Sequence, residues 1–124
     1  MATSRPSSTP LPELTRRRAE QVLAQLCDKR VPPHARAMVR LAVAFRGNTI
    51  TLTEERAPWR DDPGAEWTSS HVAQFRFQPA SQLWALYWCD RDTRWHRFEE
   101  TPPTADIAQL AHAVDLDTTG IFWG

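Results

Sequence analysis

The chain reads Leu83-Trp84-Ala85-Leu86-Tyr87-Trp88-Cys89 and, after a short polar segment, Trp95-His96-Arg97-Phe98. Both stretches are rich in aromatic and large apolar residues and are short, as is typical of β-strands. The intervening Asp90-Arg91-Asp92-Thr93 has the composition of a tight turn. The two stretches are therefore predicted to pair as antiparallel strands. Tryptophan beside arginine and histidine suits a recognition surface as well as a core, and the sequence leaves that choice open.

Similar patterns on the N-terminal side extend this sheet. Val72 to Phe77 reads as a strand, and the turn Gln78-Pro79-Ala80-Ser81 joins it to the stretch that begins at Leu83. Further upstream, apolar residues alternate on both sides of Arg46-Gly47-Asn48, which predicts a β-hairpin. Val39–Arg46 is expected to pair with Thr49–Glu55, and Leu83 to Asp90 with both of its neighbours. With Trp95 to Glu99 as the last strand, the sheet is an antiparallel meander of about five strands.

Helical patterns flank the sheet on both sides, so the predicted fold class is α+β. An N-terminal amphipathic helix runs from Glu13 to about Lys29 and ends before Pro32-Pro33. Thr104 is expected to cap the C-terminal helix. The ending Gly120 to Gly124 contains large apolar side chains and should dock on the domain. The apolar positions are Leu14, Val22, Leu23, Leu26 and Cys27 in the first helix, and Ile107, Leu110, Ala111 and Val114 in the second.

The length and composition predict one domain over residues 11–124, preceded by a disordered, proline-rich tail over residues 1–10. Residues 57–70 hold several proline, glycine and aspartate residues and read as a long surface loop. We expect Trp59 and Trp67 in this loop to cover an edge of the core. The tail lacks the apolar stretch of a secretory signal and no apolar run reaches the length of a membrane span, so we expect a cytoplasmic protein without membrane contact.

The charges are distributed unevenly along the chain. Residues 1–56 hold ten Lys and Arg against five Asp and Glu, and residues 57–124 hold five against ten. We expect these opposite charges to pair within the fold, although a basic and an acidic face are the alternative.

Several short motifs are spread between Arg30 and Gly124. They are Pro32-Pro33-His34-x-Arg36, Gly47-Asn48, Glu55-Arg56-x-Pro58-Trp59, Trp84 with Trp88, Asp92-x-x-Trp95-His96-Arg97-x-Glu99 and Gly120-x-Phe122-Trp123-Gly124. In these motifs the sequence, from about Arg30 to Gly124, resembles a bacterial family known as domain of unknown function 3024. The resemblance implies a complete member of a small bacterial domain family and lends no activity.

The polar residues of these motifs supply the candidates for chemistry. Histidine and carboxylate side chains can move protons near neutral pH, and arginine binds phosphate. The catalytic candidates are His34, His96 and Glu55. The candidate ligand-binding residues are Arg36, Arg56, Trp59, Trp88, Asp92, Trp95 and Arg97.

Strand geometry gives a structural alternative for the same residues. Neighbours in a strand point to opposite faces, so His96 and Arg97 are not expected to enter one pocket. An Arg97 that stacks on a tryptophan and pairs with Glu55 would be an ordinary packing arrangement. No metal site or cofactor motif is predicted, because the histidines and cysteines lack the spacing of metal ligands. No phosphate-binding loop is predicted either, because such loops are rich in glycine and the chain has only four glycines.

The sequence therefore favours a binding or interaction module with an aromatic- and arginine-rich sheet face. A strand face bearing Trp84 or Trp88 beside Arg56 and Arg97 would contact a protein or a small anionic ligand. Nucleic acid is a less favoured partner, since the net charge is zero and the C-terminal half is acidic. The alternative is a small metal-independent enzyme that acts on a phosphate-containing or nucleic-acid substrate through His34 and His96, with Arg56 and Arg97.

Overall fold

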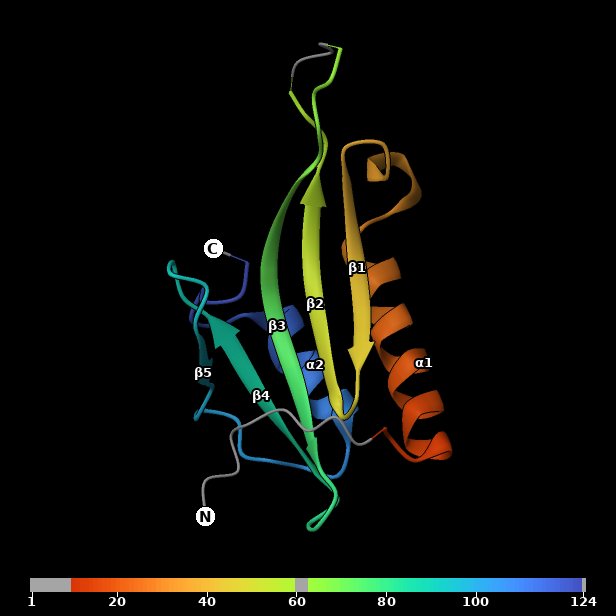
Figure 1. The fold of residues 1–124 in the computed structure, drawn as a ribbon, viewed down its shortest axis with the longest axis vertical. Coiled ribbons are helices and arrows are strands. Elements are labelled where there is room, and N and C mark those ends of the chain that lie inside the picture. Colours follow the sequence, from red (N-terminus) through yellow and green to blue (C-terminus); the bar gives the residue numbers. More distant parts are fainter. Residues whose placement is uncertain (1–9, 60–62, 124) are drawn as a thin grey trace.

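The computed structural model describes residues 10–59 and 63–123 and has the predicted α+β architecture. A five-stranded antiparallel sheet follows the first helix and precedes the second (Figure 1). The elements are α1 (Glu13–Arg30), the short 3-10 helix η1 (Pro33–Ala35), β1 (Val39–Arg46), β2 (Thr49–Arg56), β3 (Thr68–Gln78), β4 (Leu83–Cys89), β5 (Trp95–Arg97) and α2 (Ile107–Leu116).

The sheet is a simple meander, with the strands in the order β1-β2-β3-β4-β5. The expected hairpin is confirmed, with Val39 opposite Arg56 and Arg46 opposite Thr49. β4 pairs with both β3 and β5, as predicted. The register of β2 against β3 shifts between Leu52 and Thr53, which bends this pair.

Two faces of the sheet have different surroundings. The inner face packs against both helices, so its side chains form the core together with apolar residues of α1 and α2. In Figure 1, α2 lies behind β2 and β3, and no helix crosses in front of these strands. We call this uncovered side the outer face. The buried inner-face residues include Ile50, Leu52, Phe75, Phe77, Trp84 and Leu86, and the helices contribute Val22, Leu23, Leu26, Leu110 and Val114.

A two-residue turn closes the β1–β2 hairpin. Gly47 has a φ of 59°, a backbone conformation that glycine adopts without steric cost. The side-chain amide of the buried Asn48 donates a hydrogen bond to the carbonyl oxygen of Phe77, and the backbone carbonyl of Asn48 accepts one from the Phe77 amide at 3.0 Å. This turn is therefore held on β3, the next strand of the sheet.

Two expectations about the helices are wrong. Leu14 is 78 % exposed and lies outside the core, because it stands about two and a half turns before Leu23 and therefore points to the opposite side of α1. The cap of α2 is Asp106, whose carboxylate accepts a hydrogen bond from the Ala108 amide at 3.0 Å. Thr104 instead pairs with Trp84 through backbone hydrogen bonds and extends the edge of β4.

The predicted docking of the C-terminal segment is confirmed. Phe122 is buried in the core against Phe98, with 5.0 Å between the ring centroids. Asp117 has a left-handed backbone conformation, and its carboxylate accepts hydrogen bonds from the amides of Phe122 and Trp123. The Trp123 indole donates to the Val114 carbonyl at 2.8 Å. These contacts fold residues 117–123 back onto α2.

The boundaries of the loops differ from those expected. Residues 68–70 belong to β3, because they pair with the last residues of β2. β5 ends at Arg97, although Phe98 still donates a backbone hydrogen bond to Leu86. The side chain of Trp59 is 83 % exposed and does not cover the core. Nine of the ten residues of the expected tail lie outside the described residues.

Candidate functional site

The outer face gathers arginine and aromatic side chains from several strands on the side of the sheet that no helix covers. Because strand residues alternate between faces, the register assigns each of them to one side. Among the described strand residues of this face, four are arginines and one is acidic. The charged and aromatic members are Arg40 and Arg46 of β1, Glu55 of β2, His71 and Arg76 of β3, Tyr87 of β4, and Trp95 and Arg97 of β5.

Arg76 and Tyr87 form the centre of this face. The guanidinium carbon of Arg76 lies 3.9 Å from the centroid of the Tyr87 ring, and its Nε donates to Gln74 Oε1 at 2.7 Å. Gln74 in turn donates to Thr51 Oγ1 at 3.0 Å. Burial lowers the pKa of the Arg76 guanidinium, and Tyr87 partly opposes this. Arg97 lies next to Tyr87 in the neighbouring strand. A partly desolvated cation thus lies over an aromatic ring.

A second arginine and aromatic pair lies toward the β1 edge. The guanidinium carbon of Arg40 lies 4.1 Å from the centroid of Trp67, and its Nε donates to Glu55 Oε1 at 2.7 Å. This is the structural arrangement that the sequence suggested for Arg97 and Glu55. That pairing is wrong, because Glu55 lies on β2 and Arg97 lies on β5, with two strands between them.

The third cluster lies where β3 extends past β4. The rings of His71 and Trp95 are 5.4 Å apart, and His71 Nδ1 is 3.3 Å from the hydroxyl of Thr53. A pocket of about 350 Å³ adjoins this cluster and is lined by residues 69–71 and by the loop that joins β4 to β5. The outer face therefore ends in a hollow with a histidine in its wall.

The surface charge of the outer face differs from the net charge of the chain. Among the described residues, Arg46 and Arg97 take part in no ion pair, whereas the acidic residues of the helical layer are engaged there. Asp115 on α2 accepts from Lys29 Nζ at 2.7 Å and contacts Arg30 on α1. These hydrogen bonds lower the pKa of the Asp115 carboxyl. The expected pairing between the two halves thus occurs between the helices and leaves the outer face basic.

The three catalytic candidates lie on separate elements. His34 is exposed on η1, Glu55 lies on the outer face of β2, and His96 lies on the inner side of β5. Two strands separate β2 from β5 in the sheet. The structure does not bring these three side chains together.

His96 belongs to a small cluster that closes the β4–β5 turn. Its ring stacks on Trp88, with 4.7 Å between centroids, and its Nε2 is 2.6 Å from Asp90 Oδ2. The other carboxylate oxygen of Asp90 accepts from the amides of Asp92 and Arg94. The bond with His96 lowers the pKa of Asp90. Trp88 faces His96 and not Arg97, so the expected grouping of Trp88 with Arg97 on one face is wrong.

The remaining arginine candidates already have carboxylate partners. Arg36 lies 3.5 Å from Asp28, and Arg56 lies 3.1 Å from Glu54. Arg56 lines a pocket of about 230 Å³ together with Arg30 and Trp123. This pocket gathers three of the segments that carried the resemblance, but Arg30 is also paired, through Asp115. Because both arginines are paired with carboxylates, this pocket is a weaker site for an added anion than the outer face.

Other kinds of chemistry have little support in the described residues. Burial raises the pKa of the Cys89 thiol, and the neighbouring Asp90 raises it further, so the thiolate is disfavoured at neutral pH. Within residues 10–59 and 63–123, no group of three His, Cys, Asp or Glu side chains could hold a metal ion. None of the described helices is long and apolar enough to cross a membrane.

Sequence reasoning found Trp95 and Arg97 but missed most of the outer face. The missed residues stand in alternation with the core residues, as Arg76 does between Phe75 and Phe77 and Tyr87 between Leu86 and Trp88. The strand residues among them could have been found from the sequence, because they occupy the positions between the core residues. The missed strand residues are Arg40, Arg46, His71, Gln74, Arg76 and Tyr87, and the loop residue Trp67 was missed as well.

Comparison with known proteins gives one match. The family model for "Domain of unknown function (DUF3024)" matches residues 11–124, so the match also includes α1, which precedes the segment of the noted resemblance. No curated protein and no solved structure matches the chain.

Proposed function

The chain belongs to the family of the domain of unknown function DUF3024, and we propose that it is a binding module for an anionic ligand that carries planar rings. The ligand is a nucleotide or a single-stranded nucleic acid, and it binds on the outer face of the sheet. The stacking of Arg76 on Tyr87 beside Arg97, on a face without a covering helix, is the observation that carries this proposal.

Each part of this ligand has a matching group on the outer face. Guanidinium groups bind phosphate oxygens through charge-assisted hydrogen bonds, and Arg97 and Arg46 have no ion pair among the described residues that would compete. Bases stack on aromatic rings and on arginine planes, which Trp95 and the Arg40–Trp67 pair supply. The local excess of arginine outweighs the zero net charge of the whole chain, because only the charges near a bound phosphate act strongly on it.

The enzyme alternative has less support, because His34, Glu55 and His96 lie on separate elements. We propose the bacterial cytoplasm as the compartment. The unpaired Cys27 and Cys89 are in keeping with a reducing compartment, where thiols stay free.

Fluorescence anisotropy with a labelled thymidine oligonucleotide tests the proposal. We expect saturable binding, and we expect competition by adenosine monophosphate if a single nucleotide fills the site. Arg97→Ala should weaken binding about tenfold and reduce the slope of log affinity against log salt by about 0.7, the value for one phosphate contact in a single strand. Arg17→Ala is the matched control, because Arg17 is an exposed arginine on α1 that pairs with Glu13.

Three results would overturn the proposal. The first is no binding of oligonucleotide or nucleotide at low salt. The second is equal binding by wild type and Arg97→Ala. The third is competition by a polyglutamate peptide as strong as that by the oligonucleotide, which would indicate an acidic protein partner.

A further inference from the structure

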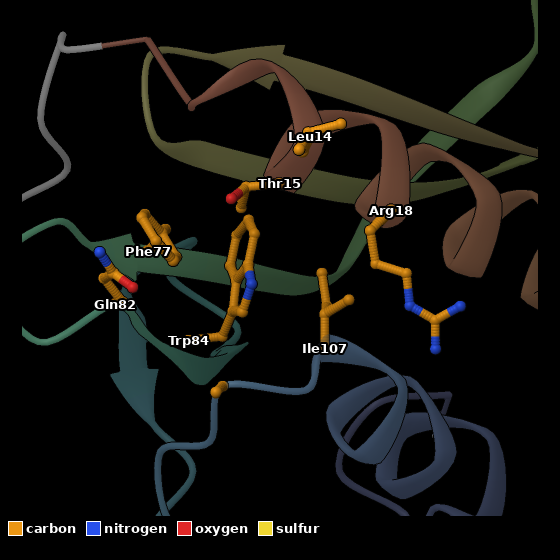
Figure 2. Close-up of a pocket in the computed structure, with 8 residues that line it drawn as sticks. Leu14, Thr15, Arg18, Phe77, Gln82, Trp84 and Ile107 are labelled. Atoms are coloured by element: carbon orange, nitrogen blue, oxygen red, sulfur yellow. The ribbon is translucent and has the colours of Figure 1, made fainter.

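A pocket of about 310 Å³ lies on the helical side of the sheet, away from the outer face. Figure 2 shows its walls, which come from the start of α1, the end of β3, the turn before β4, β4 itself and the start of α2. Nothing in the proposed function uses this pocket. Its volume is at the lower end of the range of small-molecule sites.

Trp84 supplies an unusual group to the pocket. Its side chain is among the largest buried ones, with 2 % exposure, and yet no described residue accepts a hydrogen bond from its indole Nε1. Figure 2 shows this nitrogen on the ring edge that faces Ile107 and Arg18. The indole N–H of Trp123, by contrast, donates to a backbone carbonyl. No buried side-chain nitrogen or oxygen of the described residues lacks a partner, so this nitrogen is accessible from the pocket and presents a donor that a ligand can satisfy.

Arg18 gives the pocket a positive charge. The nearest carboxylate, Asp106, lies 3.8 Å away, which is too far for a hydrogen bond. The same Asp106 oxygen is engaged by the Ala108 amide at the start of α2. The guanidinium of Arg18 therefore keeps donors for an anion, and the N-terminal end of the α2 dipole, beside Ile107, also favours negative charge.

Apolar side chains form the rest of the wall. Phe77 packs against Trp84 with 5.0 Å between the ring centroids, and Ile107 is buried beside them. Leu14 stands at the pocket with 78 % of its surface exposed. Contact with an apolar ligand would remove part of this side chain from water.

We infer that this pocket binds a small carboxylate with an apolar body. One carboxylate oxygen accepts from Trp84 Nε1 and the guanidinium of Arg18 binds the charge, while the body of the ligand contacts Leu14 and Ile107. A neutral amide of the same shape retains an acceptor for Trp84 but has no charge for Arg18. The carboxylate is thus distinguished from its amide by Arg18.

Nuclear magnetic resonance of protein with 15N-labelled tryptophan tests this inference. The probes are phenylacetate and its neutral isostere phenylacetamide. We expect phenylacetate to move the indole N–H signal of Trp84 and to leave that of Trp123 in place. We expect phenylacetamide to bind at least about tenfold more weakly, as the loss of a hydrogen bond to a charged group predicts.

Two arginine variants connect the effect to the pocket. Arg18→Met should weaken phenylacetate binding about tenfold or more and leave the weak binding of phenylacetamide nearly unchanged. Arg17→Met is the control, because Arg17 lies one residue away on α1, does not line the pocket and pairs with Glu13. The inference is overturned by an unmoved Trp84 signal, by equal affinity for the two probes, or by an Arg18→Met protein that binds phenylacetate like the wild type.

Discussion

Arg40 lies over the ring of Trp67, with its guanidinium carbon 4.1 Å from the ring centroid. Trp67 immediately precedes β3, whereas Arg40 is near the start of β1, the edge strand. The contact therefore joins two segments that are separated by β2 in the sheet. Glu55, on the strand between them, accepts from Arg40 Nε at 2.7 Å. The three side chains thus connect β1, β2 and the start of β3 across the outer face.

This connection predicts that Arg40 contributes to stability and that Arg97 does not. Arg40→Ala removes an ion pair and a cation–π contact and should lower the free energy of unfolding by about 1 kcal/mol. Arg97→Ala should change it by less than about 0.5 kcal/mol, since Arg97 is exposed and takes part in no ion pair among the described residues. Urea unfolding of both variants measures the difference. Equal destabilisation by Arg40→Ala and Arg97→Ala would contradict the stabilising role given to Arg40.

The docking of the C-terminal segment predicts a larger effect. Phe122 is buried against Phe98, so Phe122→Ala should destabilise the domain by about 3 kcal/mol. Leu116→Ala, at a position that is 58 % exposed, is the control and should cost less than about 1 kcal/mol. Thermal unfolding followed by circular dichroism compares them. If the melting temperature of Phe122→Ala equals that of Leu116→Ala, the C-terminal segment is not part of the core.

Asp115 predicts a dependence of stability on pH. Its hydrogen bonds, chiefly with Lys29, lower its pKa in the folded state below the ordinary 3.8. A carboxylate of this kind stabilises the fold at pH values above its unfolded pKa, and the contribution disappears as the pH falls through the folded pKa. Asp115→Asn should therefore be less stable than wild type by about 1 kcal/mol at pH 7.

The stability of Asp115→Asn should approach that of the wild type at acidic pH. The difference in unfolding free energy should shrink progressively below about pH 4. Asp28→Asn serves as the comparison, because the side chain of Asp28 is 76 % exposed and its contact with Arg36 is long. A constant difference between Asp115→Asn and wild type across this pH range contradicts the role given to Lys29 and Arg30.

Much of the fold was predictable because local patterns and global packing agree. Alternation and turn residues predicted the strand order and the pairing of β1 with β2, and Gly47 marked the hairpin turn. The exposure of Leu14 could have been predicted, since a position about two and a half turns before Leu23 points to the opposite side of the helix. The extension of β3 to Thr68 depends on pairing with β2, a contact between distant residues that composition does not reveal.

The candidate site was less predictable than the fold. The opposite orientation of His96 and Arg97 followed from strand geometry and is confirmed by the register. The ion-pair partners of the charged residues could not be predicted from the sequence, because Glu55 contacts Arg40 only in one particular register of β1 against β2. The basic character of the outer face arises in the same way, since it combines arginines from three strands that are far apart in the sequence.

The central claim is that the outer face binds an anionic ligand with planar rings, and backbone amide chemical-shift mapping tests it most directly. Adenosine monophosphate and a short thymidine oligonucleotide are added separately to 15N-labelled protein. The account predicts that signals near Arg76, Tyr87 and Arg97 move for at least one of these probes, and that those of His34 and Arg56 stay in place. Shifts confined to His34, Arg56 and the α1–α2 layer, or no shifts with either probe, would contradict it.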